Sequence, residues 1–208
     1  MQQVLKDSLQ GRLLEPAEAL ALCGLAGEEL QALLAAAARV RDVHKGRVVT
    51  FSPKVFVPLT NLCRDFCGYC TFRKAPDEPG AKTMTLDEVL RVVRRAKRLD
   101  CTEVLFSLGD KPEAIYPEMR AFLAERGHQR TLDYLYEACR VVLEETELLP
   151  HSNPGVMGKG DLQRLKQFNV SMGLMLESTS DRLLLNGGAH DNAPDKKPSV
   201  RLRTLEQA

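Results

Sequence analysis

The spacing of apolar residues along the chain changes near residue 47. Before that point apolar side chains recur three and four positions apart, as Leu30, Leu33 and Ala37 do. Residues spaced in this way share one face of a helix, whereas residues two apart share one face of a strand. Residues 1–47 therefore predict a helical cap, which we expect to pack on a main domain formed by residues 48–208.

Within the main domain, short apolar runs alternate with stretches of helical period. The runs predict four buried strands, at Val55–Leu59, Glu103–Ser107, Leu148–Pro150 and Val170–Leu176, and a further short strand at Val48–Phe51. Helices are predicted to begin at Thr85, Thr131, Lys159 and Ser199, and the first of these has a capping box, Thr85 with Glu88. Strands that alternate with helices indicate parallel βαβ units. The expected fold class is therefore α/β, with about four βα units.

Polar loops follow each of the four buried strands. In parallel α/β folds the carboxyl ends of the strands lie along one rim, and ligands bind there. The four loops carry a group of three cysteines, Gly109 with Asp110, Asn153, and Glu177. We therefore expect these residues to meet at one site.

The three cysteines of the first loop are Cys63, Cys67 and Cys70, in the spacing C-x₃-C-x₂-C. Thiolates are soft ligands, and three so close in sequence can hold one inorganic centre. A cubane [4Fe–4S] cluster bound by three cysteines keeps one iron without a protein ligand. That iron can bind a small molecule through an amine and a carboxylate.

Two other uses of the cysteines are less compatible with the sequence. Structural zinc sites usually present four ligands in paired knuckles, and only Cys67 and Cys70 form such a pair. The four histidines show no ligand spacing, so they do not complete a zinc site. A disulfide scaffold is disfavoured by the chain length, by the scattered positions of the other cysteines and by the lack of a secretory signal.

Composition narrows the class of protein further. The chain has 208 residues, 44% hydrophobic and 27% charged, as ordinary globular proteins have. The net charge is +1 and tryptophan is absent, which argues against a nucleic-acid partner. No apolar run reaches the roughly 18 residues that cross a bilayer, so we expect no membrane association. The expected compartment is the reducing cytoplasm, which an exposed iron–sulfur cluster would need.

Five segments of the chain resemble one enzyme family. They are Thr50–Thr60, Cys63–Phe72, Ser107–Glu113, Leu149–Gly155 and Met172–Glu177. Together they look like FO synthase, the radical S-adenosylmethionine (SAM) enzyme that makes the deazaflavin chromophore of coenzyme F-420. The resemblance is to the subunit, or the amino-terminal half of the fused enzyme, that closes the deazaflavin ring. It implies a TIM-type radical SAM barrel.

The resemblance also implies cofactors, a substrate and partners. A [4Fe–4S] cluster would cleave SAM reductively, and the 5′-deoxyadenosyl radical would take hydrogen from a hydroxybenzyl-ribitylaminouracil adduct. Ring closure would then form 7,8-didemethyl-8-hydroxy-5-deazariboflavin (FO) with release of ammonia. A sister radical SAM subunit or domain would supply the adduct, and an external donor would supply the electron.

Residue roles follow from the same resemblance. Three irons of the cluster would be held by Cys63, Cys67 and Cys70. Tyr69 would lie along the adenine of SAM, and Gly109 and Asp110 would receive its amino group. Glu177 would bond the ribose hydroxyls, and Asn153 would contact SAM or the substrate. No catalytic side chain is assigned.

One departure from the family pattern is predicted. Radical SAM cores usually supply about six βα units, of which this sequence supplies about four. The strand that would carry the family's next glycine-rich SAM loop has no counterpart before Ala208. We therefore expect a partial barrel, truncated at its carboxyl end, that is poorly stable and weakly active or inactive.

Two alternative functions remain open from the sequence. The sister radical SAM enzyme, which joins tyrosine to the ribitylaminouracil, would need the same three cysteines. A non-catalytic metal-binding fragment would need only the loop. Iron and zinc content after anaerobic reconstitution would separate the fragment from the enzymes.

Overall fold

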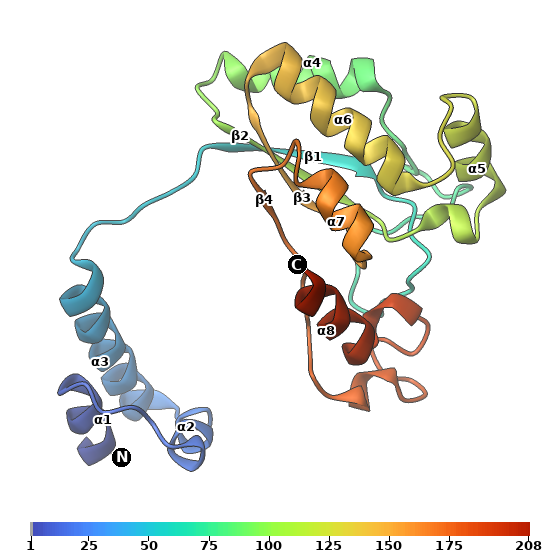
Figure 1. Ribbon diagram of the computed structural model, residues 1–208. Coiled ribbons are helices and arrows are strands. Elements are labelled where there is room, and N and C mark those ends of the chain that lie inside the picture. Colours follow the sequence, from blue (N-terminus) through green and yellow to red (C-terminus); the bar gives the residue numbers. More distant parts are fainter. Residues whose placement is uncertain (1) are drawn as a thin grey trace. The chain divides into compact units, whose positions relative to one another are not determined.

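A computed structural model describes residues 2–208 of the chain (Figure 1). The chain folds as two compact units, divided between Phe51 and Ser52. The smaller unit contains three helices, α1 (Gln2–Leu9), α2 (Pro16–Leu22) and α3 (Gly27–Lys45). The larger unit, from Ser52 onward, contains the sheet and all of the loops predicted to carry chemistry.

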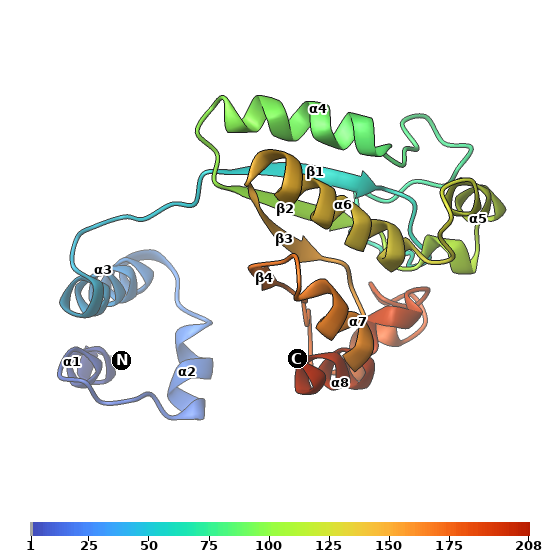
Figure 2. The same cartoon turned by 45° about the horizontal axis from the view of Figure 1, so that its top comes forward.

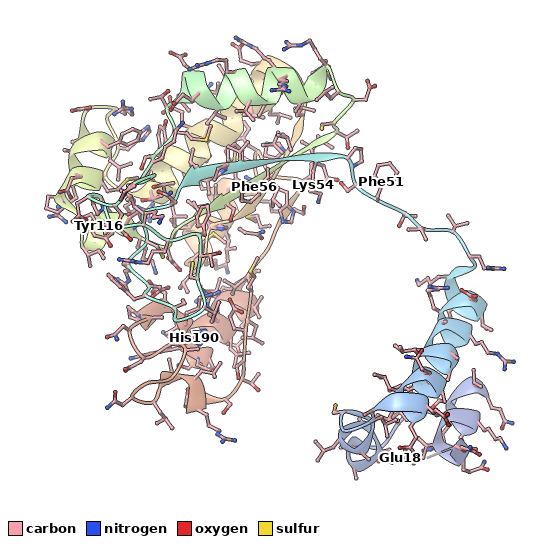
Figure 3. All side chains as sticks on the ribbon, turned by 180° about the vertical axis from the view of Figure 1, so that it is seen from behind. Glu18, Phe51, Lys54, Phe56, Tyr116 and His190 are labelled. Atoms are coloured by element: carbon pink, nitrogen blue, oxygen red, sulfur yellow. The ribbon has the colours of Figure 1, made fainter. Side chains whose placement is uncertain are left out.

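The helices of the smaller unit surround a small core. Leu5, Leu22 and Ala36 are its buried residues, one from each helix. The predicted helices are confirmed, but the strand expected at Val48–Phe51 is wrong. Those residues adopt no regular structure, and Phe51 is 86% exposed (Figure 3). Their β-branched and aromatic side chains favour a strand, but strand propensity has little effect when no neighbouring strand pairs with the backbone.

The larger unit is built on a parallel sheet. Its strands are β1 (Lys54–Thr60), β2 (Glu103–Leu108), β3 (Leu149–Asn153) and β4 (Ser171–Met172), in the order β1-β2-β3-β4. Helices α4 (Leu86–Lys97), α6 (Thr131–Thr146) and α7 (Lys159–Leu165) connect successive strands, and α4 and α6 cover one face of the sheet (Figure 2). The predicted α/β alternation is therefore confirmed. Further elements are η1 (Pro112–Ala114), α5 (Pro117–Ala124), η2 (Asp181–Leu184), η3 (Pro194–Lys196) and α8 (Pro198–Gln207).

Several predicted element boundaries match the structure, and three do not. β3 runs to Asn153 rather than ending at Pro150. Thr85 caps α4 as expected, since the Glu88 backbone N–H donates to its hydroxyl and the Thr85 N–H donates to the Glu88 carboxylate. The last helix begins at Pro198 rather than Ser199, with Lys197 as its N-cap. β4 is much shorter than predicted. The carbonyl of Met175 accepts a hydrogen bond from Arg201 of α8 (2.6 Å), so the backbone beyond Gly173 bonds a helix instead of extending the sheet.

The main core lies between the sheet and the pair α4 and α6. It includes Val57 of β1, Phe106 of β2, Val93 of α4 and Leu135 of α6, all with 0% exposure. Burying each such side chain contributes roughly 1.5–3 kcal/mol relative to leaving it in water. This packing holds α4 and α6 on one face of the sheet and so fixes the positions of the strand ends that carry the predicted site.

The substitution Leu135→Ala should lower the free energy of unfolding by about 2–5 kcal/mol, because it leaves a cavity in a fully buried layer. Chemical denaturation followed by circular dichroism would measure the change. Leu99→Ala is the control, since Leu99 is 68% exposed and its truncation should cost less than about 0.5 kcal/mol. Equal losses for the two variants would contradict this placement of the core.

Candidate active site

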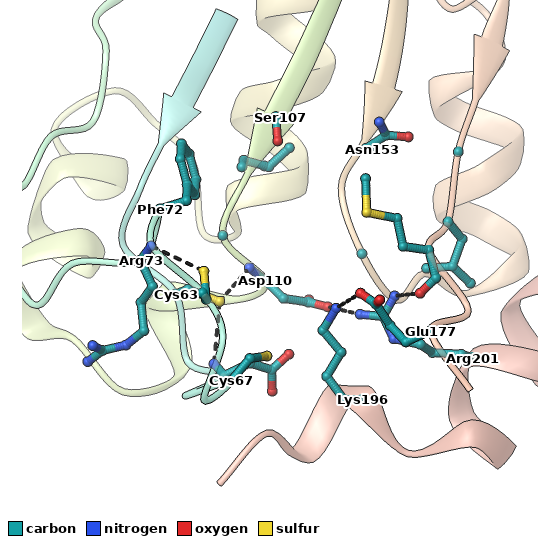
Figure 4. Close-up of a pocket in the computed structure, with 18 of the residues that line it drawn as sticks. Cys63, Cys67, Phe72, Arg73, Ser107, Asp110, Asn153, Glu177, Lys196 and Arg201 are labelled. Atoms are coloured by element: carbon teal, nitrogen blue, oxygen red, sulfur yellow. Dashed lines mark hydrogen bonds and ion pairs between the residues drawn. The ribbon is translucent and has the colours of Figure 1, made fainter. Parts of the chain in front are cut away.

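The cysteine loop leaves the carboxyl end of β1 and borders a cavity of about 220 Å³ (Figure 4). Cys63, Cys67 and Cys70 all line this cavity, and all three thiols are free. The cavity wall also contains every residue that the sequence predicted to bind a cofactor. These are Tyr69, Gly109, Asp110, Asn153 and Glu177. The expectation that the strand-end loops converge is therefore met, whereas the role of each residue stays a prediction.

Backbone N–H groups point at the sulfur atoms of the loop. Cys63 Sγ accepts hydrogen bonds from the N–H groups of Asp65 (3.4 Å) and Asp110 (3.2 Å), and Cys70 Sγ accepts one from Arg73 (3.4 Å). Burial raises the pKa of the Cys63 thiol to about 12, and the two N–H donors oppose that rise. A metal would hold the sulfur as a thiolate, and these donors would then stabilise its charge.

Glycines at three strand ends make room for the polar groups of the site. A Cβ on Gly109 would overlap the Leu62 carbonyl oxygen and lie 2.6 Å from Cys63 Cβ. A Cβ on Gly155 would meet the Asp110 carboxylate, and one on Gly173 would meet the Asn153 amide oxygen. The ends of β2, β3 and β4 thus each contribute one glycine. In each case the group that packs against the glycine comes from the end of the preceding strand. We call these three residues the rim glycines.

Asp110 lies deeper than its predicted role suggests, at 6% exposure. One carboxylate oxygen, Oδ2, accepts the Val156 N–H (3.1 Å) and lies 4.0 Å from the guanidinium of Arg201. The other, Oδ1, is buried and has no hydrogen-bond partner in the structure. Burial raises the pKa of this carboxyl to about 7, and a cationic ligand beside Oδ1 would lower it again.

Tyr69 and Glu177 are both held by the segment that follows β4. The Tyr69 hydroxyl is 2.9 Å from Nε2 of His190, whose side chain is buried. Glu177 forms an ion pair with Lys196, and its backbone has φ = +66°, a conformation that non-glycine residues rarely adopt. Strained backbone of this kind clusters at ligand sites, which is consistent with a functional role for Glu177.

The same segment pairs with the cysteine loop, which sequence reasoning did not anticipate. The Phe66 N–H donates to the Asn192 carbonyl and the Gly68 N–H to the Ala189 carbonyl, each at 2.8 Å. The backbone of this segment runs antiparallel to the cysteine loop at Phe66. Pairing between segments more than 100 residues apart produces no periodic signal in a sequence.

A partly buried ion-pair network next to the cysteine loop was also missed. It combines three carboxylates with three cations, and its members are Asp65, Asp110, Asp195, Arg64, Lys111 and Arg201. The carboxylates lie at 2–6% exposure, and one oxygen of each is within 4.8 Å of the others. Such a group of carboxylates can bind a cation, but here three protein cations already balance its charge. Charged residues next to a cysteine motif are the only sequence signal that points to it.

The residues of the cavity fit the cofactors that the sequence implied. Three free thiols, two of which accept backbone N–H groups, suit the irons of a cluster, because iron–sulfur clusters are held by cysteine thiolates and tuned by hydrogen bonds to sulfur. Cys63, Cys67 and Cys70 would supply three ligands to such a cluster, one fewer than a cubane has irons. Oδ1 of Asp110 is buried and accepts no hydrogen bond, although Lys111 Nζ lies 3.8 Å away, so it could accept one from the ammonium group of a ligand.

Comparison with protein families identifies the class. Residues 57–208 match the model of the radical SAM superfamily, so the chain belongs to that superfamily. Solved structures with the same fold include the FeFe-hydrogenase maturase HydG from Carboxydothermus hydrogenoformans (TM-score 0.75, 23% identity, 100% of this chain and 44% of that one). Methylornithine synthase (PylB) is similar at TM-score 0.71 and 19% identity, over 99% of this chain and 56% of that one. The predicted partial barrel is thus confirmed as a fold.

Curated relatives are considerably more similar in sequence. The chain is 48% identical over 218 residues to FO synthase of Streptomyces coelicolor, covering 100% of this chain and 25% of that protein. It is 45% identical over 161 residues to 7,8-didemethyl-8-hydroxy-5-deazariboflavin synthase of Methanopyrus kandleri, covering 77% of this chain and 48% of that protein. The resemblance to FO synthase is thereby confirmed, and the chain spans about a quarter to a half of these relatives' length.

No helix within residues 2–208 combines the length and apolar character needed to span a bilayer.

Proposed function

We propose that the chain provides the SAM-cleaving, ring-closing part of an FO synthase. The observation that carries the proposal is the meeting, at one cavity, of three free thiols and five polar or glycine positions from four strand ends. The identity of 45–48% to proteins named for this synthesis supports the choice of substrate, a hydroxybenzyl-ribitylaminouracil adduct. The product would be FO, with ammonia released. The wider assembly would include the sister radical SAM domain or subunit and an external electron donor, in the cytoplasm.

The chain's own residues would bind and orient SAM. Cys63, Cys67 and Cys70 would hold a [4Fe–4S] cluster, which when bound supplies the electron for reductive cleavage of SAM. Asp110 would accept a hydrogen bond from the ammonium of SAM through Oδ1, which accepts none within the protein. Glu177 would bond the ribose hydroxyls, and the Tyr69 ring, fixed by His190, would lie along the adenine.

The remaining rim residues would shape and close the cavity. Gly109 lets the cysteine loop approach the end of β2 closely, and Gly173 leaves room for the Asn153 amide at the cavity wall. Asn153 would contact SAM or the substrate. Exclusion of water from this cavity would protect the reactive species that SAM cleavage generates.

Anaerobic reconstitution with iron and sulfide tests the proposal. We expect about four irons per chain and a spectral change on addition of SAM. Release of 5′-deoxyadenosine with a chemical reductant should be detectable but slow, because the barrel is partial. Addition of the adduct should then yield a product with deazaflavin absorbance and ammonia. One zinc per chain and no iron would refute the cluster, and SAM cleavage that the adduct does not stimulate would refute the substrate.

A further inference from the structure

The carboxylate of Asp195 contacts the cysteine loop and has no role in the proposed function. Asp195, in η3, is 4% exposed. Its Oδ2 lies 2.6 Å from Nε of Arg64, and its Oδ1 accepts hydrogen bonds from Nη2 of Arg64 (3.1 Å) and from Nζ of Lys111 (3.0 Å). Arg64 directly follows Cys63, and Lys111 directly follows Asp110. The Asp195 side chain therefore binds the sequence neighbours of both Cys63 and Asp110.

Backbone groups of the same residue extend these contacts. The Asp195 N–H donates to Asp65 Oδ1 (3.0 Å), and the Asp195 carbonyl accepts from Nε of Arg201 (2.9 Å). Asp195 therefore contacts the cysteine loop, the loop after β2 and α8 at once. Arg64 donates one hydrogen bond to Oδ1, and its Nε lies within ion-pair distance of Oδ2 without the geometry of a second hydrogen bond, so one guanidinium reaches both carboxylate oxygens.

The network around Asp195 is charge-balanced without a metal ion. Its carboxylates and its cations are equal in number, and Arg64, Lys111 and Arg201 all come within 4.0 Å of a carboxylate oxygen. A divalent cation placed among the acids would also be repelled by three cationic side chains. The group is therefore suited to holding the three loops together rather than to binding a cation.

We propose that Asp195 is a positioning residue for the cluster, acting through Arg64 on Cys63. Resting on the proposed function, this inference adds a residue that orients a ligand of the cluster without touching it. Partners of metal ligands affect metal retention strongly, and their loss typically costs about 10-fold to 100-fold in affinity or activity. Asp195→Asn should release Arg64 and Lys111 and so loosen the sulfur that the N–H donors of Asp65 and Asp110 hold.

The test compares variants of the reconstituted protein. We expect Asp195→Asn to lose iron to a chelator about tenfold or more faster than the unsubstituted protein, with a changed electron paramagnetic resonance spectrum of the reduced cluster in the presence of SAM. Arg64→Lys keeps the charge but removes the guanidinium that reaches both oxygens of Asp195, so it should show the same changes even if Asp195→Asn folds poorly. Combining the two should add little, because both break one interaction.

Asp133→Asn is the matched control. Asp133, in the first turn of α6, also pairs with two arginines, Arg130 (2.9 Å) and Arg164 (2.6 Å), so its substitution removes a comparable contact far along the chain from the loop. It should leave iron loss within about twofold. Iron loss and spectrum equal to this control in both Asp195→Asn and Arg64→Lys would overturn the proposal.

A metal-free measurement separates this inference from the proposed function. In the protein without iron, alkylation of Cys63 by iodoacetamide, mapped by mass spectrometry, should speed up about tenfold in Asp195→Asn and not in Asp133→Asn. Faster alkylation would support positioning of Cys63 even if the unsubstituted protein failed to take up iron, which alone would refute the proposed function. Unchanged alkylation of Cys63 would overturn the positioning role.

Discussion

Replacement of Cys67 by alanine should abolish cluster binding. Among the described residues, Cys63, Cys67 and Cys70 are the cysteines that line the cavity. The loss of one thiol would leave two ligands for a cluster that needs three. We expect iron after reconstitution to fall from about four per chain to less than about one, and 5′-deoxyadenosine release to fall to background. Iron assay, absorbance and product chromatography would measure the change, and Cys63→Ala and Cys70→Ala should behave alike.

The matched control is Cys23→Ala in the helical unit. Cys23 is exposed and belongs to the other unit of the chain, so its loss should change neither iron content nor SAM cleavage. A Cys67→Ala protein that still retained four irons would show that the ligands lie elsewhere. Loss of iron on Cys23→Ala would show that a fourth cysteine takes part.

Gly109→Ala should destabilise the larger unit and dislodge the cysteine loop. The added Cβ would lie 2.7 Å from the Leu62 carbonyl carbon and 2.6 Å from Cys63 Cβ. The carbonyl carbon and oxygen of Leu62 belong to the backbone, so they cannot rotate away from the added Cβ as a side chain can. We expect a loss of about 3 kcal/mol in the free energy of unfolding, near the upper end for overpacking, together with loss of bound iron. Denaturant titration and iron assay would measure both.

Gly160→Ala provides the comparison for that prediction. Gly160 lies within α7, and nothing approaches the position of its Cβ within 4 Å. Alanine there should stabilise the protein by about 0.5–1 kcal/mol, because glycine loses more backbone entropy in a helix. If Gly109→Ala were as stable as Gly160→Ala and kept its iron, the close approach of the loop to β2 would be wrong.

The sequence predicted most of the fold because its elements have strong periodic signals. The first residue of α6 was found correctly, and β2 was found within one residue at each end, since a regular apolar pattern marks each. α5 was missed, although Pro117 at its first turn was an available signal. The strand at Val48–Phe51 was wrong because propensity describes a residue and not its pairing partner.

The site was predictable as far as strand ends determine it. Parallel topology alone places Cys63, Gly109 and Asn153 on one rim. Glu177 lies beyond the end of the short β4, and all four residues line the cavity. The contacts that hold these residues in place could not be predicted. Asp195 meets Arg64 across 131 positions of sequence, and such a contact depends on how the chain returns after β4. No local pattern encodes that return.

The rim glycines have a consequence for how the site can change. Asp110 occupies the space that a side chain at 155 would need, and Asn153 occupies the space that one at 173 would need. Neighbouring positions around the rim are therefore interlocked, and a larger residue at one requires a smaller or reoriented one beside it. Variation of this cavity, in nature or in the laboratory, should proceed by paired substitutions on adjacent strand ends rather than by single steps.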